Sequence, residues 1–316
     1  MKKDILWLKS NLGMERIAIQ DDHFMGDHKR AKEIISFIRD QDLKVFFQSG
    51  VTMFSLTREM LELLVSAGIK ELVLPIESGS ARVAKELMKK GHVSRKIIDR
   101  VTNDCAELGI QMDANLIIGM PGETMDDIDE GIQYLKTLDV NWFRIYVATP
   151  LPGSELFEQC MDEGYIDLED SIGSDFKRAR ITTEDFSPDD IERKAYEMNL
   201  ELNFLHNADM RNSRYEKAFS AFQNVINITE GHAFAHYAAA QALKNMQRLF
   251  DYNRYAQEYN QIISNSEYWT SYASKFGVPL ALSLVDDIAL DNNLPSYTLE
   301  VAAPVSGMLT QASTFT

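Results

Sequence analysis

Four short segments in the first half of the sequence each follow an apolar run and carry residue types that could bind a ligand. The apolar runs are typical of buried strands and the stretches between them of helices, and this alternation builds a parallel sheet or barrel. Such folds bind ligands at the carboxyl ends of their strands. The segments therefore predict a ligand site, and they are Asp21-Asp22-His23-Phe24, Glu77-Ser78-Gly79-Ser80, Gly119-Met120-Pro121-Gly122-Glu123-Thr124 and Thr149-Pro150-Leu151-Pro152-Gly153-Ser154.

The first two segments offer carboxylates. Adjacent strand residues point to opposite faces, so at most one of Asp21 and Asp22 faces a ligand, where it would bind an ammonium or hydroxyl group. The alternative is an acidic turn that caps a helix. A carboxylate such as Glu77 is costly at the end of an inward-facing strand unless it has a partner. Ser78 and Gly79 suit a tight turn that exposes hydrogen-bond donors, and the alternative is a turn with Ser80 as helix cap.

The other two segments shape the backbone. Gly119 and Gly122 allow close backbone approach, which fits a flat apolar ligand resting on the main chain. Neither a phosphate loop nor a dinucleotide-binding glycine pattern is present. Pro150 and Pro152 fix a rigid turn with exposed carbonyls, or else the segment is simply the exit from the barrel.

The histidines do not form a metal-binding pattern. His232 and His236 lie four residues apart on a predicted helix, but a third ligand and a suitably placed Glu are lacking. We interpret both as ordinary packing or surface residues and predict no metal ligands. His23 and His28 lie near the acidic pair and are candidates for substrate contact.

Apolar periodicity predicts the elements that position these segments. Strands are expected at 16–20, 45–48, 72–76, 113–118 and 142–147, the third in spite of Pro75. Helices are expected at 4–12, 27–40, 57–67, 81–90, 94–108 and 125–138, and then at 191–207, 214–226, 232–246 and 252–263. Five β/α units suggest an open or partial parallel barrel.

Polarity and apolar periodicity change along the chain, and these changes predict four regions. We expect a partial barrel over 1–166, a polar linker over 167–190, an all-helical region over 191–275 and a loose or disordered tail over 276–316. Small residues beside aromatic ones resemble tetratricopeptide helices. The helical region holds only one and a half such repeats, so it must pack on the preceding domain.

The amino-acid composition argues against several classes of protein. The 316 residues carry a formal net charge of −16, which argues against a nucleic-acid-binding face. Two cysteines, Cys105 and Cys160, are too few and too far apart for a disulfide framework or a cysteine metal site. The sequence has neither a signal peptide nor a membrane-spanning stretch, so we predict a soluble cytoplasmic protein.

In spacing and order, the four segments over about residues 4–165 resemble the radical S-adenosylmethionine superfamily. The likeness is to its cobalamin-binding class, which includes anaerobic magnesium-protoporphyrin ester cyclase and many methyltransferases. The runs that carry it are Asp21-Asp22-His23-Phe24, Ile76-Glu77-Ser78-Gly79-Ser80, Ile117-Ile118-Gly119-Met120-Pro121-Gly122-Glu123-Thr124 and Pro150-Leu151-Pro152-Gly153. The helical extension of some members also resembles residues 191 onward.

The resemblance implies an S-adenosylmethionine site. Asp21 and Asp22 would lie near the amino group of the methionyl moiety, and Glu77 and Ser78 would contact the ribose and carboxylate. Adenine would rest on the backbone of the Ile-Gly-x-Pro-Gly segment and the next strand end, with the residues Ile118, Gly119, Pro121, Val147 and Ala148.

One departure from the family shapes the expected function. A [4Fe–4S] cluster and cobalamin are implied by the family, but the Cys-x3-Cys-x2-Cys loop that holds the cluster is absent from this sequence. We therefore expect an N-terminally truncated (β/α)6-type barrel that lacks its first strand and is inactive alone. In intact form it would perform radical methylation, cyclisation or related C–H chemistry on a small-molecule or lipid-like substrate. The alternatives are a non-catalytic module that docks a protein partner through the helical region, and a hydrolase with paired carboxylates.

Overall fold

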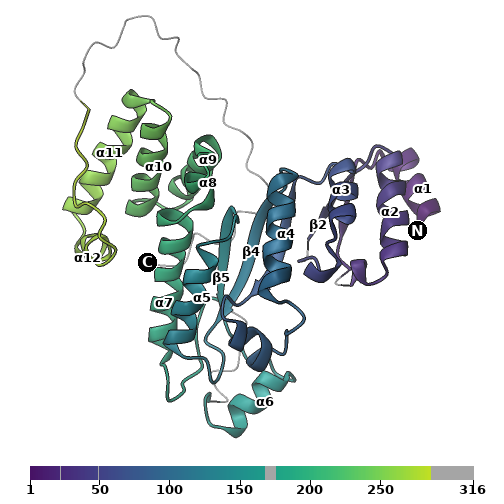
Figure 1. Ribbon diagram of the computed structural model, residues 1–316, viewed down its shortest axis with the longest axis horizontal. Coiled ribbons are helices and arrows are strands. Elements are labelled where there is room, and N and C mark those ends of the chain that lie inside the picture. The colour runs from purple at the N-terminus through teal and green to yellow at the C-terminus, as the bar shows by residue number, and fades with distance from the viewer. Residues whose placement is uncertain (22, 49, 168–175, 286–316) are drawn as a thin grey trace, which may run out of the picture. The chain divides into compact units, whose positions relative to one another are not determined.

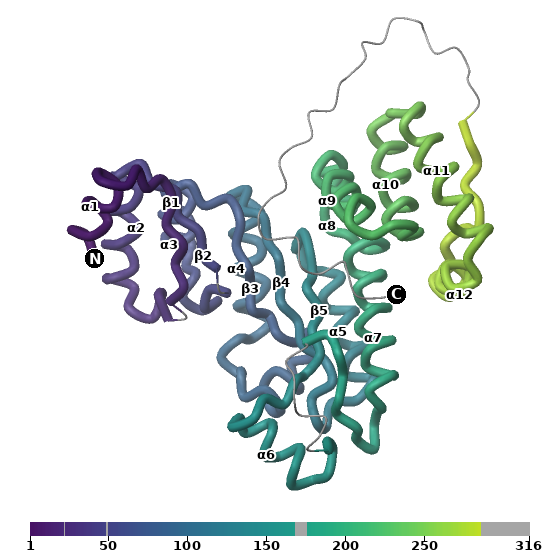
Figure 2. The backbone as a smooth tube through the Cα atoms, turned by 180° about the vertical axis from the view of Figure 1, so that it is seen from behind, coloured from purple at the N-terminus to yellow at the C-terminus, as the bar shows by residue number. Residues whose placement is uncertain are grey.

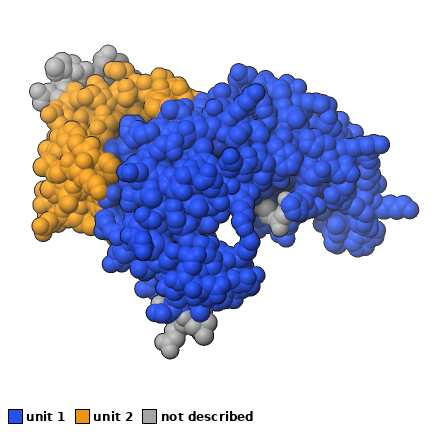
Figure 3. All heavy atoms as spheres, turned by 60° about the horizontal axis from the view of Figure 1, so that its bottom comes forward, with its two compact units in different colours: residues 1–208 blue, residues 209–316 orange. Residues whose placement is uncertain are grey.

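The computed structural model describes residues 1–21, 23–48, 50–167 and 176–285. The chain divides into two compact units, 1–208 and 209–316 (Figure 3). In unit 1 the strands are β1 Arg16–Ile19, β2 Lys44–Phe47, β3 Glu71–Glu77, β4 Gln111–Ile118 and β5 Trp142–Val147. Its α-helices are α1 Lys2–Leu12, α2 His28–Asp40, α3 Arg58–Ser66, α4 Arg95–Glu107, α5 Met125–Leu135, α6 Glu155–Asp162 and α7 Pro188–Leu200. The short helical turns are η1 Phe24–Gly26, η2 Met53–Ser55, η3 Val83–Leu87 and η5 Glu201–Leu205.

The five expected strands are present, and all pair in parallel, as the β/α alternation predicts (Figure 1). They form two sheets, β1-β2 and β3-β4-β5, instead of one continuous barrel wall. A hydrogen bond from Val51 N–H to Val73 C=O (3.3 Å) links the segment after β2 to β3. Pro75 lies two residues farther along β3, on the same side, and has no N–H to extend this ladder. The sheet is therefore interrupted between β2 and β3.

One face of the larger sheet forms the core of unit 1. Successive strand residues alternate between faces, and on this face the side chains are apolar and buried. Helices α4 and α5 pack their apolar stripes against it. The strand residues on this face are Leu72, Leu74, Ile76, Met112, Ala114, Leu116, Ile118, Phe143 and Val147.

The free edge of β5 is closed by side-chain and loop contacts. Asn203, in η5, accepts a hydrogen bond from Phe143 N–H and donates one to Phe143 C=O, each 2.8 Å long. Farther along the strand, Val147 N–H donates to the carbonyl of Phe176 (2.9 Å). Unpaired strand edges invite pairing with other chains, so these contacts remove a hazard.

Some expected elements differ from those observed. Where a helix is expected over 81–90, the structure has the short π-helix η3. Helix α6 and the later helix α12 (Glu267–Lys275) were not expected. The polar linker expected over 167–190 includes the first turn of α7, which starts at Pro188 after a Ser187–Asp190 capping box. The two compact units divide after Ala208, so α7 lies in unit 1, where its apolar residues join the core.

Unit 2 is helical, as expected, and its remaining helices are α8 Ala208–Arg211, which begins at the boundary, α9 Tyr215–Ile228, α10 Ala233–Asn245 and α11 Leu249–Ser264. Buried alanines of α10 allow α9 and α11 to pack closely on it. The expected tail begins at 276, but residues 279–285 are bonded to α11, for example through Tyr259 Oη to Pro279 C=O (2.5 Å). Residues 286–316 lie outside the described residues.

No helix in the described part of the chain has both the length and the apolar character needed to cross a membrane.

Candidate functional site

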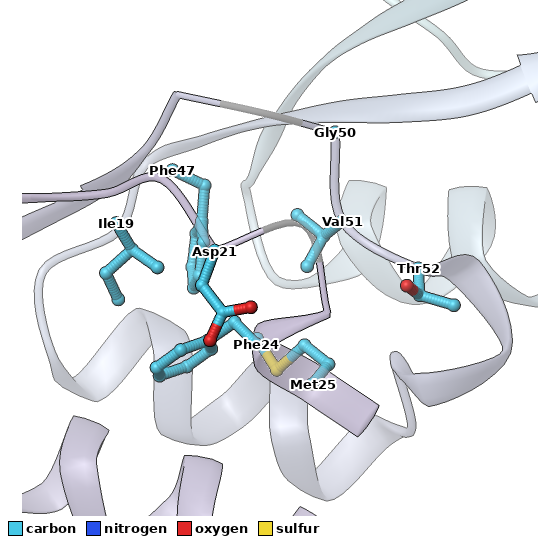
Figure 4. Close-up of a pocket in the computed structure, with 8 residues that line it drawn as sticks. All are labelled: Ile19, Asp21, Phe24, Met25, Phe47, Gly50, Val51 and Thr52. Atoms are coloured by element: carbon cyan, nitrogen blue, oxygen red, sulfur yellow. The ribbon is translucent and has the colours of Figure 1, made fainter. Parts of the chain in front are cut away.

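A small hollow lies at the carboxyl ends of β1 and β2, beside Asp21. It is lined by Ile19, Asp21, Phe24, Met25, Phe47, Gly50, Val51 and Thr52. Figure 4 shows Asp21 in the middle of this group, with Ile19 on one side and Val51 and Thr52 on the other. The position agrees with the rule that parallel strands bind ligands at their carboxyl ends. The hollow combines one carboxylate with mostly apolar walls.

The Asp21 carboxylate is held by its own turn. One oxygen accepts from His23 N–H (3.0 Å) and the other from Arg30 Nη2 (3.2 Å). The His23 backbone bond and then Arg30 hold the pKa of Asp21 below its usual value, so the group is ionised at neutral pH. Asp22 lies outside the described residues, so Asp21 is the described member of the acidic pair.

At the end of β3 the chain turns sharply through Glu77. This residue has a φ of +68°, in the left-handed region that non-glycine residues rarely occupy, and the β3–β4 register shifts between Pro75 and Glu77. Ser78 N–H donates to the Ile76 carbonyl (2.9 Å), which closes the turn. Lys90 Nζ donates to Glu77 Oε1 at 2.5 Å, and the Glu77 residue is 9% exposed. A buried carboxylate with a single cationic partner is thus fixed at the strand end.

The next residues of this turn lie against helix α5. A Cβ on Gly79 would lie 2.7 Å from Gly131 Cα, closer than real Cβ contacts, so only glycine fits there. Arg95 Nη2 donates to the Gly79 carbonyl at 2.8 Å. The turn after β3 is therefore locked onto the helix that follows β4, and the two strand ends are held together.

The glycine segment after β4 is closed by the buried carboxylate of Glu123. Its Oε2 accepts from Gly119 N–H (2.6 Å) and Met120 N–H (3.0 Å), and burial raises the pKa of Glu123 to about 7. Gly119 has a φ of +85°, and Ile191 of α7 packs against its Cα, so a side chain at 119 would be strained in backbone and in packing.

The ends of β4 and β5 are joined by their backbones. Ala148 N–H donates to the Ile118 carbonyl at 2.8 Å, and Ile118 pairs with Val147 in the ladder. All three residues and Pro121 are buried. The structure thus brings Ile118, Gly119, Val147 and Ala148 to one end of the sheet.

The predicted residues fall into two groups. Glu77 pairs with Leu116 in the ladder, so Glu77 and Ser78 lie at the same end of β3-β4-β5 as Gly119. Asp21 belongs to the other sheet, whose neighbouring loop reaches the larger sheet where Gly50 packs beside Pro75. The strand-end segments thus occupy the carboxyl ends of two adjoining sheets.

Sequence reasoning missed Lys90 and the closing role of Glu123. A buried Glu77 requires a cation, and the Lys89-Lys90 pair thirteen residues on could have been proposed for it. Nothing in the sequence shows that the Glu123 side chain turns back onto Gly119. Phe24 belongs to the first predicted segment, whereas nothing in the sequence marks Met25 and Phe47, which also line the hollow, as site residues.

The metal-ligating residue types do not converge among the described residues, where no group of three or more His, Cys, Asp or Glu could hold a metal ion. His232 and His236 are both buried in α10 or at its start, and His232 accepts from Ala235 N–H as the helix cap. The packing role predicted for these histidines agrees with this geometry.

Part of this chain is similar in sequence to known proteins. Residues 1–135 match the model of the radical SAM superfamily. The cytidylyl-2-hydroxyethylphosphonate methyltransferase of Streptomyces wedmorensis is 27% identical over 175 residues, which is 54% of this chain and 33% of that protein. An uncharacterised methyltransferase of Pyrococcus horikoshii is 28% identical over 146 residues, 46% of this chain and 31% of that protein. The chain thus spans about a third of the length of these relatives.

Among solved structures, the radical S-adenosylmethionine methyltransferase TsrM of Kitasatospora setae, with cobalamin and a [4Fe–4S] cluster bound, aligns with a TM-score of 0.43. It is 19% identical, and the alignment covers 50% of this chain and 31% of that one. The family match rests instead on the sequence of residues 1–135, which hold Asp21, Glu77, Gly119 and Glu123. Over residues 1–135 this chain is thus similar to the radical SAM superfamily.

Proposed function

We propose that unit 1 binds S-adenosylmethionine at the carboxyl ends of its strands and serves a methyltransferase of the cobalamin-binding radical SAM class. The match to the superfamily model over residues 1–135 and the two methyltransferase relatives support this proposal. The parallel strand ends supply the kind of place where such folds bind their ligands.

The observation that carries the proposal is the turn at Glu77. A non-glycine residue in the left-handed region costs about 1–2 kcal/mol, and burying a carboxylate adds to this cost. Strain of this kind persists where the surrounding structure enforces it, and such strain clusters at functional sites. Here Lys90, the Ser78 bond and the close approach of Gly79 to Gly131 enforce it.

Each strand end receives one part of the ligand in this proposal. Asp21, with Asp22 beside it in sequence, would accept the methionyl ammonium group, and Glu77 and Ser78 would bind the ribose hydroxyls and the ligand carboxylate. The backbone and side chains of the β4 and β5 ends would support adenine. The residues assigned to adenine are Ile118, Gly119, Pro121, Val147 and Ala148.

The cysteines of this sequence do not fit an iron–sulfur cluster. Cluster iron needs several thiolates at one place. Cys105 lies in α4 and Cys160 in α6, both are buried, and burial raises the pKa of their thiols to about 12 and about 11. Cys105 and Cys160 therefore cannot hold the cluster together.

The proposal is tested by calorimetric titration of this chain with S-adenosylmethionine. Glu77→Gln keeps the size of the side chain and removes its charge, so we expect binding about tenfold weaker, equivalent to about 1.4 kcal/mol. The matched control is Glu71→Gln, at the exposed opposite end of the same strand, which should bind like the unaltered chain. Circular dichroism would confirm that both variants fold. Equal binding by both variants contradicts the assignment of Glu77. An unaltered chain that binds no S-adenosylmethionine refutes the proposal and favours a non-catalytic module.

A further inference from the structure

Residues 279–285 of unit 2 run along one face of α11 without forming a helix or a strand. Figure 2 shows the chain after α12 passing beside α11, as Figure 1 does from the other side. The start of this stretch is fixed, because Val278 is buried and its N–H donates to the Ala273 carbonyl (2.8 Å). We call residues 279–285 the bound segment.

Two asparagines of α11 hold the bound segment by its main chain. Asn260 Oδ1 accepts from Leu282 N–H (2.7 Å), and Asn260 Nδ2 donates to the Leu282 carbonyl (2.9 Å). Asn253 makes the same two bonds to Val285, at 2.9 and 2.8 Å. Each side-chain amide therefore pairs with one residue as a neighbouring strand does in a β-ladder.

The spacing of the asparagines matches the spacing of an extended chain. Asn253 and Asn260 are seven residues apart, so they share a helix face and lie about 10 Å apart along the axis. Leu282 and Val285 are three residues apart, which spans about 9–10 Å in an extended chain. The α11 face thus presents two amides at the distance that three residues of an extended peptide require.

Two tyrosines on the same face add bonds to main-chain carbonyls. Tyr259 Oη donates to the Pro279 carbonyl (2.5 Å), and Tyr252 Oη donates to the Ser283 carbonyl (2.8 Å). Both tyrosine residues are buried, so their hydroxyls are held in place for these bonds. Proline, which has no N–H, stands at 279, where α11 uses only a carbonyl. The contacts of this face therefore require an extended main chain and depend little on side chains.

The bound segment contributes little to the core of unit 2. Leu280 is 49% exposed and Leu284 is 43% exposed, and every residue of the bound segment is exposed or half-buried. The similar pair in unit 1 is different, because Asn203 and Phe143 are both buried there. A segment that is held at the surface by its main chain can be exchanged for a segment of another sequence.

We propose that this face of α11 is a binding site for an extended peptide of a partner protein, and that the bound segment occupies the site until such a peptide displaces it. The partner peptide has apolar residues three apart, as Leu282 and Val285 are, with free N–H groups at both positions. The inference concerns unit 2 and does not depend on the proposed function of unit 1.

The tether at Val278 determines which occupant can displace the bound segment. A short tether holds a segment at a local concentration of about millimolar, so an incoming peptide must bind more tightly than the bound segment does. A second copy of this chain would bring the same segment without the tether. We therefore assign the site to a different protein.

The first test measures whether the bound segment opens while unit 2 stays folded. Hydrogen exchange of the full chain would compare the amides of Leu282 and Val285 with that of Ala239, a buried residue in the middle of α10. We expect protection about a hundredfold lower at the two segment amides, because they open locally. Equal protection at the three amides would show that the segment is a structural part of unit 2, and would overturn the proposal.

The second test measures binding of a fluorescein-labelled peptide of residues 277–285 by fluorescence anisotropy. The host is the full chain with Leu282→Pro and Val285→Pro, which removes both N–H donors from its own segment and leaves α11 unchanged. We expect saturable binding by this host and about tenfold weaker binding by the unaltered chain, whose own segment competes. A peptide with proline at the same two positions should not bind, whereas a peptide with Leu284→Ser should bind like the natural one.

Variants of α11 test the site itself. In the host, Asn260→Leu removes two hydrogen bonds and should weaken peptide binding about tenfold, and Asn253→Leu serves if that variant does not fold by circular dichroism. The matched control is Gln257→Leu, at an exposed position of the same helix, which should bind like the host. Equal binding by the asparagine variant and the control, no binding by the host, or binding of the proline peptide refutes the proposal. A dimer of the unaltered chain in light scattering that the host does not form would make a second copy the occupant, and would also overturn the proposal.

Discussion

The buried carboxylate of Glu123 makes the stability of unit 1 depend on pH. Its pKa of about 7 exceeds the ordinary value of 4.5, because burial opposes ionisation more than the Gly119 and Met120 N–H groups favour it. The folded state therefore keeps a proton that the unfolded state has released between these two values. Stability from this group is fully present below pH 4.5 and is lost as the pH rises through about 7.

The magnitude follows from the two pKa values. One pH unit corresponds to about 1.4 kcal/mol, so the difference between 4.5 and about 7 makes the loss about 3 kcal/mol. Glu123→Gln carries no ionisable group, but its amide oxygen can still accept from Gly119 N–H. We expect the variant to match the unaltered chain near pH 4.5 and to be about 3 kcal/mol more stable at pH 8.

Native-state hydrogen exchange of the β4 amides measures the opening free energy of unit 1 itself. It would be recorded for both proteins from pH 4.5 to 8 and corrected for the intrinsic exchange rate. Subtracting the two curves cancels the other titrating groups. A difference that stays constant with pH, or a variant less stable than the unaltered chain at pH 8, refutes the reasoning. The second result would mean that the two N–H donors hold the carboxylate ionised.

Two further predictions concern packing and a second pH response. Gly79→Ala should destabilise unit 1 by about 3 kcal/mol because the new Cβ would overlap the backbone of Gly131, whereas Gly26→Ala, with no atom nearer than 3.9 Å, should be nearly neutral in thermal unfolding. Burial lowers the pKa of His232 from 6.5 to about 4, so unit 2 should lose about 3 kcal/mol as the pH falls from 6.5 to 4. Fluorescence of Trp269, whose ring lies 4.9 Å from that of His232, would follow this loss. A His232→Gln variant with the same acid sensitivity would contradict the assignment.

The strands could be predicted because their signals are local. Each apolar run is buried on at least one face, and even Pro75 remains within β3, as expected from the flanking pattern. The break between β2 and β3 could not be predicted, because it depends on which side of the strand lacks an N–H. That side is known only once the neighbours of β3 are known.

The positions of the segments at the strand ends were predictable, but the contacts of their side chains were not. The segment order placed Glu77 and Gly119 at strand ends, and the structure puts them at the same end of one sheet. The pairing of Glu77 with Lys90 depends on η3, a wide turn where an ordinary helix was expected. Side-chain partners that are set by irregular backbone have no periodic pattern in the sequence.

The contact between Asn203 and β5 fixes where α7 lies along the strand, and therefore which α7 residue reaches the glycine segment after β4. Asn203 is bonded at two points to Phe143, and Ile191, twelve residues earlier, rests on Gly119. A helix rises about 1.5 Å per residue, so about 18 Å of chain separates the anchor from the glycine loop. Deleting one residue of α7 would turn Ile191 by about 100° and move it off Gly119, although neither contact had been altered. The number of residues between Ile191 and Asn203 thus determines whether Ile191 meets Gly119.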